Sequence, residues 1–147
     1  MQAGTGHAVV PFMAVRSYRD LIAWQLASQF QKEVLRLLQA SPEAWRNNKF
    51  RDQLIDAVNS VVANLAEGFR RFSPGEFCKF IDYSLASLGE AEVRLEGGID
   101  VGYFSAEHCA LAFQLARRCL TASIRLKQSQ SRFTRARKPR RSRIPPP

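Results

Sequence analysis

Arginine and lysine side chains gather at the C-terminal end of this 147-residue chain. Residues 125–147 hold nine of them and no acidic residue, whereas residues 1–124 hold 13 basic and 13 acidic residues. The formal net charge of +9 therefore belongs to the C-terminal segment. Arginine binds phosphate through its bidentate guanidinium, so this segment is typical of a contact with nucleic acid that is blind to base sequence. The candidate contacts are Arg132, Arg135, Arg137, Lys138, Arg140, Arg141 and Arg143. A tail that only keeps the protein soluble is the alternative interpretation.

A second basic group flanks the turn expected between the second and third helices. It consists of Arg70, Arg71 and Lys79. Backbone N–H groups at the start of a helix favour anions, so these side chains could form a phosphate-binding rim. An ordinary solvated loop explains them equally well, and the sequence leaves both interpretations open.

Polar residues also mark the end of the second expected helix and the helix that follows it: Asn64, Glu67, Gly68, Ser87 and Glu90. One interpretation is a polar site that contacts RNA or a partner. We favour a structural one, in which Asn64 and Glu67 form hydrogen bonds at the helix end or between helices, with Ser87 or Glu90 as partners. Gly68 is then expected to adopt the left-handed conformation that ends a helix.

The sequence contains few residues in patterns typical of catalysis. The two histidines, His7 and His108, belong to no metal-binding or catalytic motif, and no phosphate loop or nucleophile elbow is present. The odd number of cysteines, with no CxxC pair, is not typical of a disulfide framework or a zinc site. The sequence predicts a protein that is not an enzyme and that uses no cofactor or metal.

Four amphipathic helices must position these residues. Ser17, Ser41-Pro42, Ser73-Pro74 and Ser105 are typical helix starts. Apolar residues then recur at three- and four-residue steps, and in the fourth helix they are Leu111, Leu115, Cys119 or Leu120, and Ile124. Short connectors between four such helices predict an all-α, up-down-up-down four-helix bundle.

This pattern divides the chain into a disordered leader (1–16), a four-helix bundle (17–127) and a disordered basic tail that ends in prolines (128–147). No apolar stretch approaches the ~20 residues that span a bilayer. We therefore expect a cytoplasmic protein that makes no membrane contact. Either Met1 or Met13 is compatible with the start of the chain.

The motifs along residues 17–126 resemble one known family. They are YRDLIAWQ at 18–25, SVVANLAEGFR at 60–70, EFCKF at 76–80, SLGEAE at 87–92 and GYF at 102–104. In this order they resemble the bacterial four-helix-bundle proteins called 23S rRNA intervening-sequence proteins. These are related to the accessory variability protein of diversity-generating retroelements.

The resemblance implies a left-handed four-helix bundle that assembles as a ring-like homopentamer. It also implies kinship with a basic pentamer that binds nucleic acid and a reverse transcriptase. This chain departs from the family pattern where Val62 replaces a common proline, so the second helix is expected to run unbroken. Ile55 and Asp56 replace frequent arginines, and Gly97-Gly98 replace helix formers that would strengthen the end of the third helix.

Two functions therefore stand beside each other. The first is a non-enzymatic accessory protein, a homo-oligomeric bundle that binds RNA or DNA. The alternative is a protein–protein scaffold that docks a partner enzyme, such as a reverse transcriptase, with the basic tail incidental.

Overall fold

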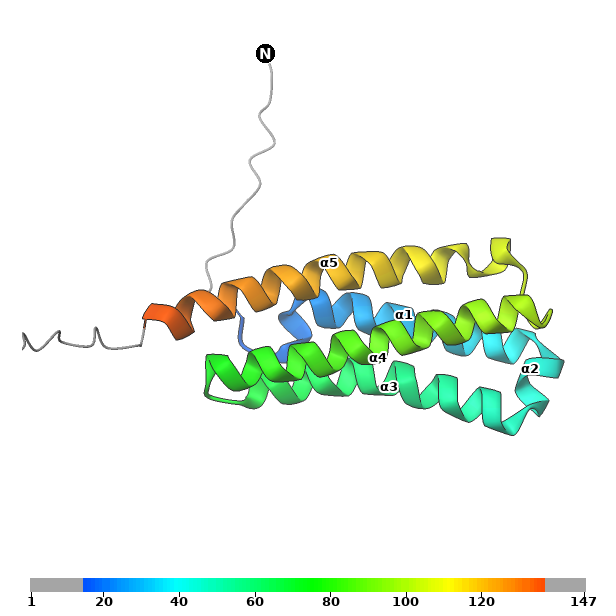
Figure 1. Ribbon diagram of the computed structural model, residues 1–147, viewed down its shortest axis with the longest axis horizontal. Coiled ribbons are helices and arrows are strands. Elements are labelled where there is room, and N and C mark those ends of the chain that lie inside the picture. Colours follow the sequence, from blue (N-terminus) through cyan, green and yellow to red (C-terminus); the bar gives the residue numbers. More distant parts are fainter. Residues whose placement is uncertain (1–14, 137–147) are drawn as a thin grey trace, which may run out of the picture.

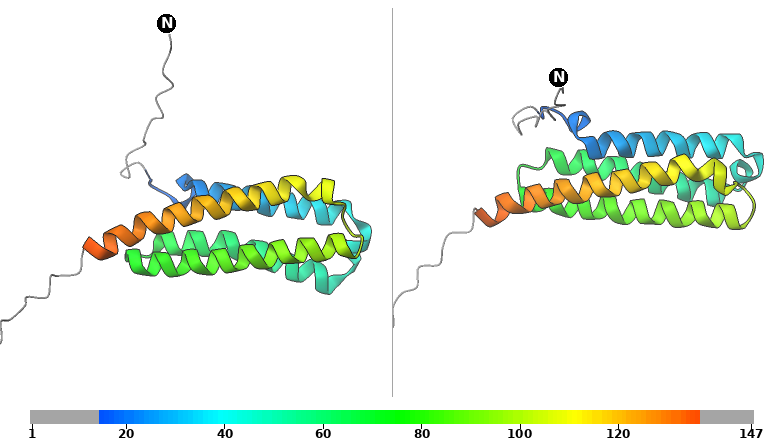
Figure 2. Two further views of the ribbon diagram at one scale, coloured as in Figure 1. Left: turned by 45° about the horizontal axis from the view of Figure 1, so that its top comes forward. Right: turned by 90° about the horizontal axis from the view of Figure 1, so that it is seen from above.

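The computed structural model describes residues 15–136, and every regular element in that range is a helix. The prediction of an all-helical fold is confirmed. Four long helices lie side by side, and their colours show that successive long helices run in opposite directions (Figures 1 and 2). In chain order the elements are the 3₁₀ turn η2 (Tyr18–Asp20), α1 (Ile22–Ala40), α2 (Pro42–Arg46), α3 (Asn48–Arg70), α4 (Pro74–Asp100) and α5 (Ala106–Ala136).

The predicted capping residues start most of these elements. The Ser41 hydroxyl accepts from the backbone N–H of Ala44 at 3.3 Å, and the Ser73 hydroxyl accepts from that of Glu76 at 3.4 Å. Pro42 and Pro74 follow them at the first helical positions, where a missing N–H has no cost. α3 runs without a break to Arg70, as expected with Val62 in place of proline.

The first helix begins later than the sequence indicated. Ser17 and Asp20 do form a complete capping box, but the box closes only the short turn η2. Leu21 is extended after that turn, at φ −70° and ψ 123°, and its side chain is buried. α1 therefore starts at Ile22 because Leu21 leaves the helical path to reach the core.

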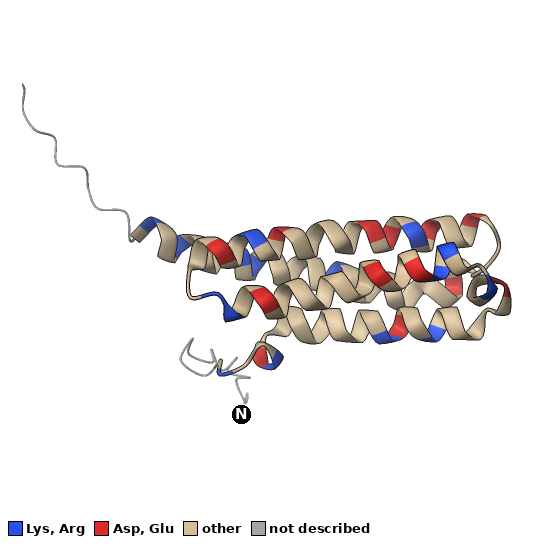
Figure 3. Cartoon of the chain, turned by 90° about the horizontal axis from the view of Figure 1, so that it is seen from below, with Lys and Arg blue, Asp and Glu red and all other residues tan. Residues whose placement is uncertain are grey.

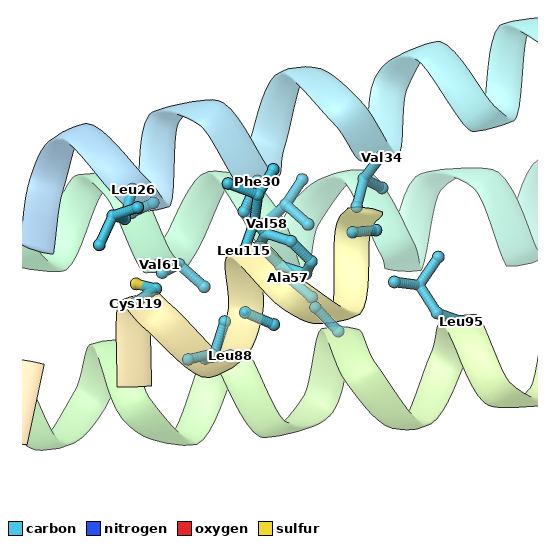
Figure 4. Packing of buried hydrophobic residues seen from close by; sticks show 14 of the residues in the cluster. Leu26, Phe30, Val34, Ala57, Val58, Val61, Leu88, Leu95, Leu115 and Cys119 are labelled. Atoms are coloured by element: carbon cyan, nitrogen blue, oxygen red, sulfur yellow. The ribbon is translucent and has the colours of Figure 1, made fainter. Parts of the chain in front are cut away.

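The core runs along the middle of the four long helices (Figure 4). Phe30 and Val34 of α1 meet residues from the other three helices, and burying each such side chain contributes about 1.5–3 kcal/mol. Among the buried residues labelled there are Leu26, Ala57, Val58, Val61, Leu88, Leu95, Leu115 and Cys119.

α5 turns a different face to the core than the leucine pattern predicted. Leu111, Leu120 and Ile124 are 50%, 40% and 41% exposed, and the core positions are taken by small residues. These are Cys109, Ala112, Ala116 and Ser123, together with Leu115 and Cys119, which the sequence pattern predicted correctly. Small side chains let α5 approach its neighbours closely, so its larger apolar residues remain outside.

The double glycine near the end of α4 does not stop the helix, which continues to Asp100. A Cβ atom on Gly98 would lie 2.8 Å from the Phe104 ring and 2.9 Å from the Phe50 ring. Gly98 thus makes room for two aromatic rings that pack against the helix end. The chain then reverses at Gly102, whose φ of +85° is readily accessible only to glycine.

The expectation of disorder from residue 128 onward is wrong for residues 128–136, which form the last turns of α5. Gln130 is buried there, and the Cys78 thiol lies 3.7 Å from the Lys127 carbonyl and 3.6 Å from the Ser131 hydroxyl. Arginine and glutamine are good helix formers, so the helix extends as long as one face still contacts α4. The predicted leader up to residue 14 and the tail from 137 lie outside the described residues.

Between residues 15 and 136, no helix is long and apolar enough to cross a bilayer. The same range contains no cluster of His, Cys, Asp and Glu that could hold a metal ion.

Candidate nucleic-acid interface

The α3–α4 turn brings Arg70 and Arg71 together, but both guanidinium groups already have partners. Arg71 forms an ion pair with Glu67 at 2.8 Å and lies 4.9 Å from the centre of the Phe80 ring. Arg70 lies 5.4 Å from the centre of the Tyr18 ring. A phosphate would have to compete with these contacts, so the predicted rim is a weaker anion site than its sequence indicated.

Carboxylates weaken this site further. A cleft of about 560 Å³ at the turn is lined by Arg70 and Arg71 but also by Glu67 and Glu76. Lys79, the third predicted rim residue, is exposed on α4 and does not line that cleft. The turn therefore has nearly balanced charge.

The polar motif ahead of the turn links α3 to α4. The Asn64 amide donates to the carbonyl of Ser60 at 2.8 Å and to its hydroxyl at 2.9 Å, and the Ser87 hydroxyl donates to the Ser60 hydroxyl at 2.8 Å. Asn64 and Ser87 are thus connected through Ser60. The Ser60 hydroxyl, which the sequence gave no reason to single out, is the centre of this network.

Glu67 and Glu90 do not join the network. Glu67 pairs with Arg71 within α3, and Glu90 pairs with Arg94 within α4 at 2.8 Å. Arg94 also donates to the Gln53 side chain at 2.7 Å and so ties α4 to α3. The predicted inter-helix role of Glu90 is therefore indirect.

Gly68 does not end its helix, and the predicted left-handed conformation is wrong. α3 continues to Arg70, and Gly102 is the residue with positive φ between 15 and 136. A Cβ atom at Gly68 would lie 2.7 Å from atoms of both Phe77 and Phe80. Glycine is needed here because α4 packs the Phe77 ring and the Cβ atom of Phe80 directly against the α3 backbone.

A stronger basic surface lies on the outer side of α5. Arg118, Arg125 and Arg132 follow one another at seven-residue intervals, so they lie nearly in line along the helix, about 10 Å apart. We call these three residues the α5 arginine stripe. All three are exposed, and none has an ion pair or hydrogen bond with another residue of the described range. Their guanidinium groups are available to a ligand.

A groove beside α1 extends this surface. It has a volume of about 330 Å³, and its α5 wall carries Arg117, Arg118, Thr121 and Arg125. Ile22 contributes from the α1 side. Three guanidinium groups and a hydroxyl along one groove can bind successive phosphates.

Charge is strongly segregated between α4 and α5, although residues 1–124 are neutral in total. α4 carries six acidic and two basic residues, whereas α5 carries six basic residues and Glu107 as its one acid. Basic positions mark the end of α5 that leads into the grey C-terminal trace (Figure 3). Of the predicted tail contacts, Arg132 and Arg135 are helical and exposed. Those at 137, 138, 140, 141 and 143 lie outside the described residues.

Arg117 and Arg118 were not predicted as contacts, because residues 1–124 are neutral in total and their basic positions did not stand out. The seven-residue spacing of Arg118, Arg125 and Arg132 was visible and is the signal that could have found the stripe.

The buried thiols of α5 have environments that disfavour their charged form. Burial raises the pKa of Cys119 to about 11, against a smaller opposing effect of its contact with Ser123. The pKa of Cys109 is also raised, first by burial and then by the nearby Glu33 carboxylate. At neutral pH these thiols stay protonated and are poor nucleophiles.

Comparison with known proteins gives one result that spans these features. No curated protein matches the chain. A family model described as 23S rRNA-intervening sequence protein matches residues 19–132, which cover the α3–α4 turn, the Ser60 network and the whole α5 arginine stripe. The resemblance noted from the motifs is thereby confirmed, and the chain belongs to the 23S rRNA-intervening sequence protein family.

Proposed function

We propose that this protein is a non-enzymatic accessory protein that binds RNA through the outer side of α5. The observation that carries the proposal is the α5 arginine stripe, three exposed and aligned arginines without a protein partner between residues 15 and 136. The family description, which names an rRNA insert, favours RNA over DNA.

The physical basis is release of counterions. Each phosphate neutralised by arginine releases condensed cations and contributes about 0.7–0.9 to the slope of log affinity against log salt. An arginine that has no carboxylate partner makes this contact without first breaking an ion pair. Seven further basic residues lie between positions 127 and 143 of the sequence.

We propose further that the chain acts as a homo-oligomer, a left-handed bundle assembled into the pentamer that the resemblance implies. Exposed apolar side chains support this part of the proposal. Tyr83 and Val93 on α4 are 55% and 65% exposed, and Leu111 on α5 is 50% exposed. Repetition of the stripe around a ring would convert a modest single site into tight multivalent binding.

The test is RNA binding by a variant that carries Arg118→Ala, Arg125→Ala and Arg132→Ala. We expect its salt slope to fall by about two to three, with a loss of affinity of at least about tenfold at low salt. The matched control is Lys32→Ala, Arg46→Ala and Lys49→Ala, which removes the same charge from other exposed positions. Both variants are made in the full chain and in a chain ending at residue 136, so that the tail cannot mask the stripe.

Equal losses in the two variants would contradict a specific interface on α5 and indicate general attraction by net charge. If neither the full chain nor the shortened chain binds RNA, the scaffold function takes precedence. The exposed Tyr83 and Val93 would then be the surface that docks a partner enzyme such as a reverse transcriptase.

A further inference from the structure

A cavity of about 300 Å³ opens at the end of the molecule where the α3–α4 turn meets α5. Its walls include the rings of Phe69, Phe72 and Phe77, with Leu21 at the side of α1. This volume is at the lower end of the range for small-molecule sites, about 300–1,000 Å³. The cavity is therefore large enough for one planar aromatic group.

Two of the aromatic rings define the shape of this cavity. Phe77 is buried and fixes its floor, whereas Phe72 lines the cavity while its side chain is fully exposed. Phe72 thus stands at the mouth, where its ring can contact a ligand that enters. Because this ring lies outside the core, it can contact a ligand without disturbing the packing of the helices.

Gln130 provides the polar element of the cavity. Its residue is 6% exposed, and its side-chain amide has no hydrogen-bond partner within residues 15–136. Within residues 15–136 its amide nitrogen and oxygen are not sealed from solvent. The amide is therefore open to the cavity that this residue lines. An amide offers one acceptor and two donors, which is the pattern needed to pair with the edge of a nucleobase.

Arginine side chains lie on both sides of the opening. Arg71 lines the cavity from the α3–α4 turn. On α5, Ser129 lines the cavity, and Arg125 lies one helical turn before it in the α1–α5 groove. Leu21 lines the cavity and the adjacent Ile22 lines the groove, so the two hollows are neighbours along α1. An RNA strand whose phosphates follow the groove would therefore reach the mouth of the cavity.

From this geometry we infer that the cavity binds a single unpaired nucleobase of the bound RNA, stacked against Phe72 and paired with the Gln130 amide. This inference rests on the proposed function. It adds a preference for RNA with looped or bulged nucleotides, because a base inside a duplex cannot reach the cavity. The phosphate contacts of α5 then position the strand, and the cavity selects its unpaired part.

The chain itself offers a rival occupant. Residues 8–13, with the sequence AVVPFM, are apolar and come shortly before Val15, which lines the cavity. An apolar peptide would fill the space but brings no aromatic heterocycle to pair with Gln130. The nucleobase satisfies both the rings and the amide, and for this reason we prefer it.

The experiment compares two RNA hairpins that share one stem, with a loop of ordinary nucleotides in one and abasic nucleotides in the other. The full-length protein is expected to prefer the loop that has bases by about tenfold, a typical effect of one stacked base. 2-Aminopurine placed in the loop should change its fluorescence on binding.

Two variants locate the base. Phe72→Ala should reduce the preference to about twofold or less without changing the salt slope, because stacking involves no phosphate. Gln130→Leu retains the bulk of the side chain and should reduce discrimination among loop bases several-fold. Gln128→Leu, at an exposed position of the same helix, is the matched control and should leave both properties unchanged. Thermal unfolding confirms that each variant is folded.

Equal affinity of the wild-type protein for the two hairpins overturns the inference and leaves the proposed function standing. Retention of the preference in both Phe72→Ala and Gln130→Leu also overturns it, since the base must then bind elsewhere. If deletion of residues 1–14 creates a preference that the full chain lacks, the N-terminal segment occupies the cavity and the inference is wrong. Loss of all RNA binding would instead contradict the proposed function.

Discussion

The arginines at the α3–α4 turn and those on α5 are the same residue type in two different situations. Arg71 is held between Glu67 and Phe80, and Arg70 packs against Tyr18. Arg118 and Arg125 line an open groove and have no carboxylate partner in the described part of the chain. In the first region arginine helps to hold helix ends together, and in the second it is free to meet a ligand.

The difference shows why a count of basic residues is a poor guide to a binding surface. The turn was predicted to bind phosphate because its two arginines are adjacent in sequence. In the structure both guanidinium groups already contact neighbouring side chains. The arginines of α5 are separated by seven residues and become a surface only when the helix aligns them. Availability depends on what lies within reach of each guanidinium group.

The largest expected effect comes from breaking the turn itself with Gly68→Ala. The new Cβ atom would lie 2.7 Å from Phe77 and Phe80, so α3 and α4 must move apart. We expect a loss of about 1–3 kcal/mol in the free energy of unfolding, measured by urea denaturation. Gly89→Ala is the control, because a Cβ atom there meets nothing within 4 Å. That change should stabilise α4 by about 0.5–1 kcal/mol. Similar results for the two variants would show that the close approach at Gly68 is unimportant.

A smaller effect should follow from Glu67→Gln, which sharpens the comparison by making a turn arginine resemble those on α5. Arg71 loses its ion pair and becomes available to phosphate, so RNA affinity should rise about two- to fivefold, with a salt slope steeper by less than one. Fluorescence anisotropy at several salt concentrations measures both quantities. Glu90→Gln, which removes an equal charge from an ion pair on α4, is the control. An equal gain in the control would mean that net charge, and not the release of Arg71, is responsible.

The smallest effect concerns Glu92, whose carboxylate interacts with Arg117 at the edge of the groove. Burial raises the pKa of Glu92, Glu96 raises it further, and Arg117 lowers it. A raised pKa in the folded protein means that the protonated carboxyl is the better-tolerated form. Its contribution to stability is therefore full below the ordinary value of 4.5 and is lost as the pH rises through the folded pKa.

Glu92→Gln removes the negative charge that lowers the stability of the folded protein at pH values above the pKa of Glu92. The variant should be more stable than wild type at pH 7 by less than about 1 kcal/mol, and the gain should vanish below about pH 4. Thermal unfolding across this pH range provides the measurement. Asp56→Asn, on the exposed side of α3, serves as the control. A gain for Glu92→Gln that persists at low pH would rule out titration of this carboxyl as its cause.

Much of the local structure could be predicted from single residues. Ser73 followed by Pro74 started α4 as expected, and Ser41 followed by Pro42 started α2, because caps depend on adjacent atoms. The face of α5 could not be predicted in this way. Its leucines at 111 and 120 are outside because alanine and cysteine allow a closer approach of the helices, which is a property of the packed neighbours.

The candidate site likewise has features that single residues predict and features that depend on the packed helices. Arg132 and Arg135 were predicted as contacts, but their helical presentation was not, since basic composition alone indicated a tail. The partners of Arg70 and Arg71 come from η2 and α4 as well as from α3. Gln130 gave no signal at all in the sequence, because its lack of a partner is visible only when the surrounding helices are in place.

The last turns of α5 have a consequence for the kinetics of amide hydrogen exchange. Residues 132–136 are all exposed, so the helix there gains little from packing and its stability depends on the local helix–coil equilibrium. The contact of Cys78 with Lys127 and Ser131 is an anchor close to this end. Exchange should therefore be fast beyond Ser131 and slow before Lys127 in the free protein. Phosphates bound at Arg132 and Arg135 would select the helical state and extend slow exchange toward Ala136.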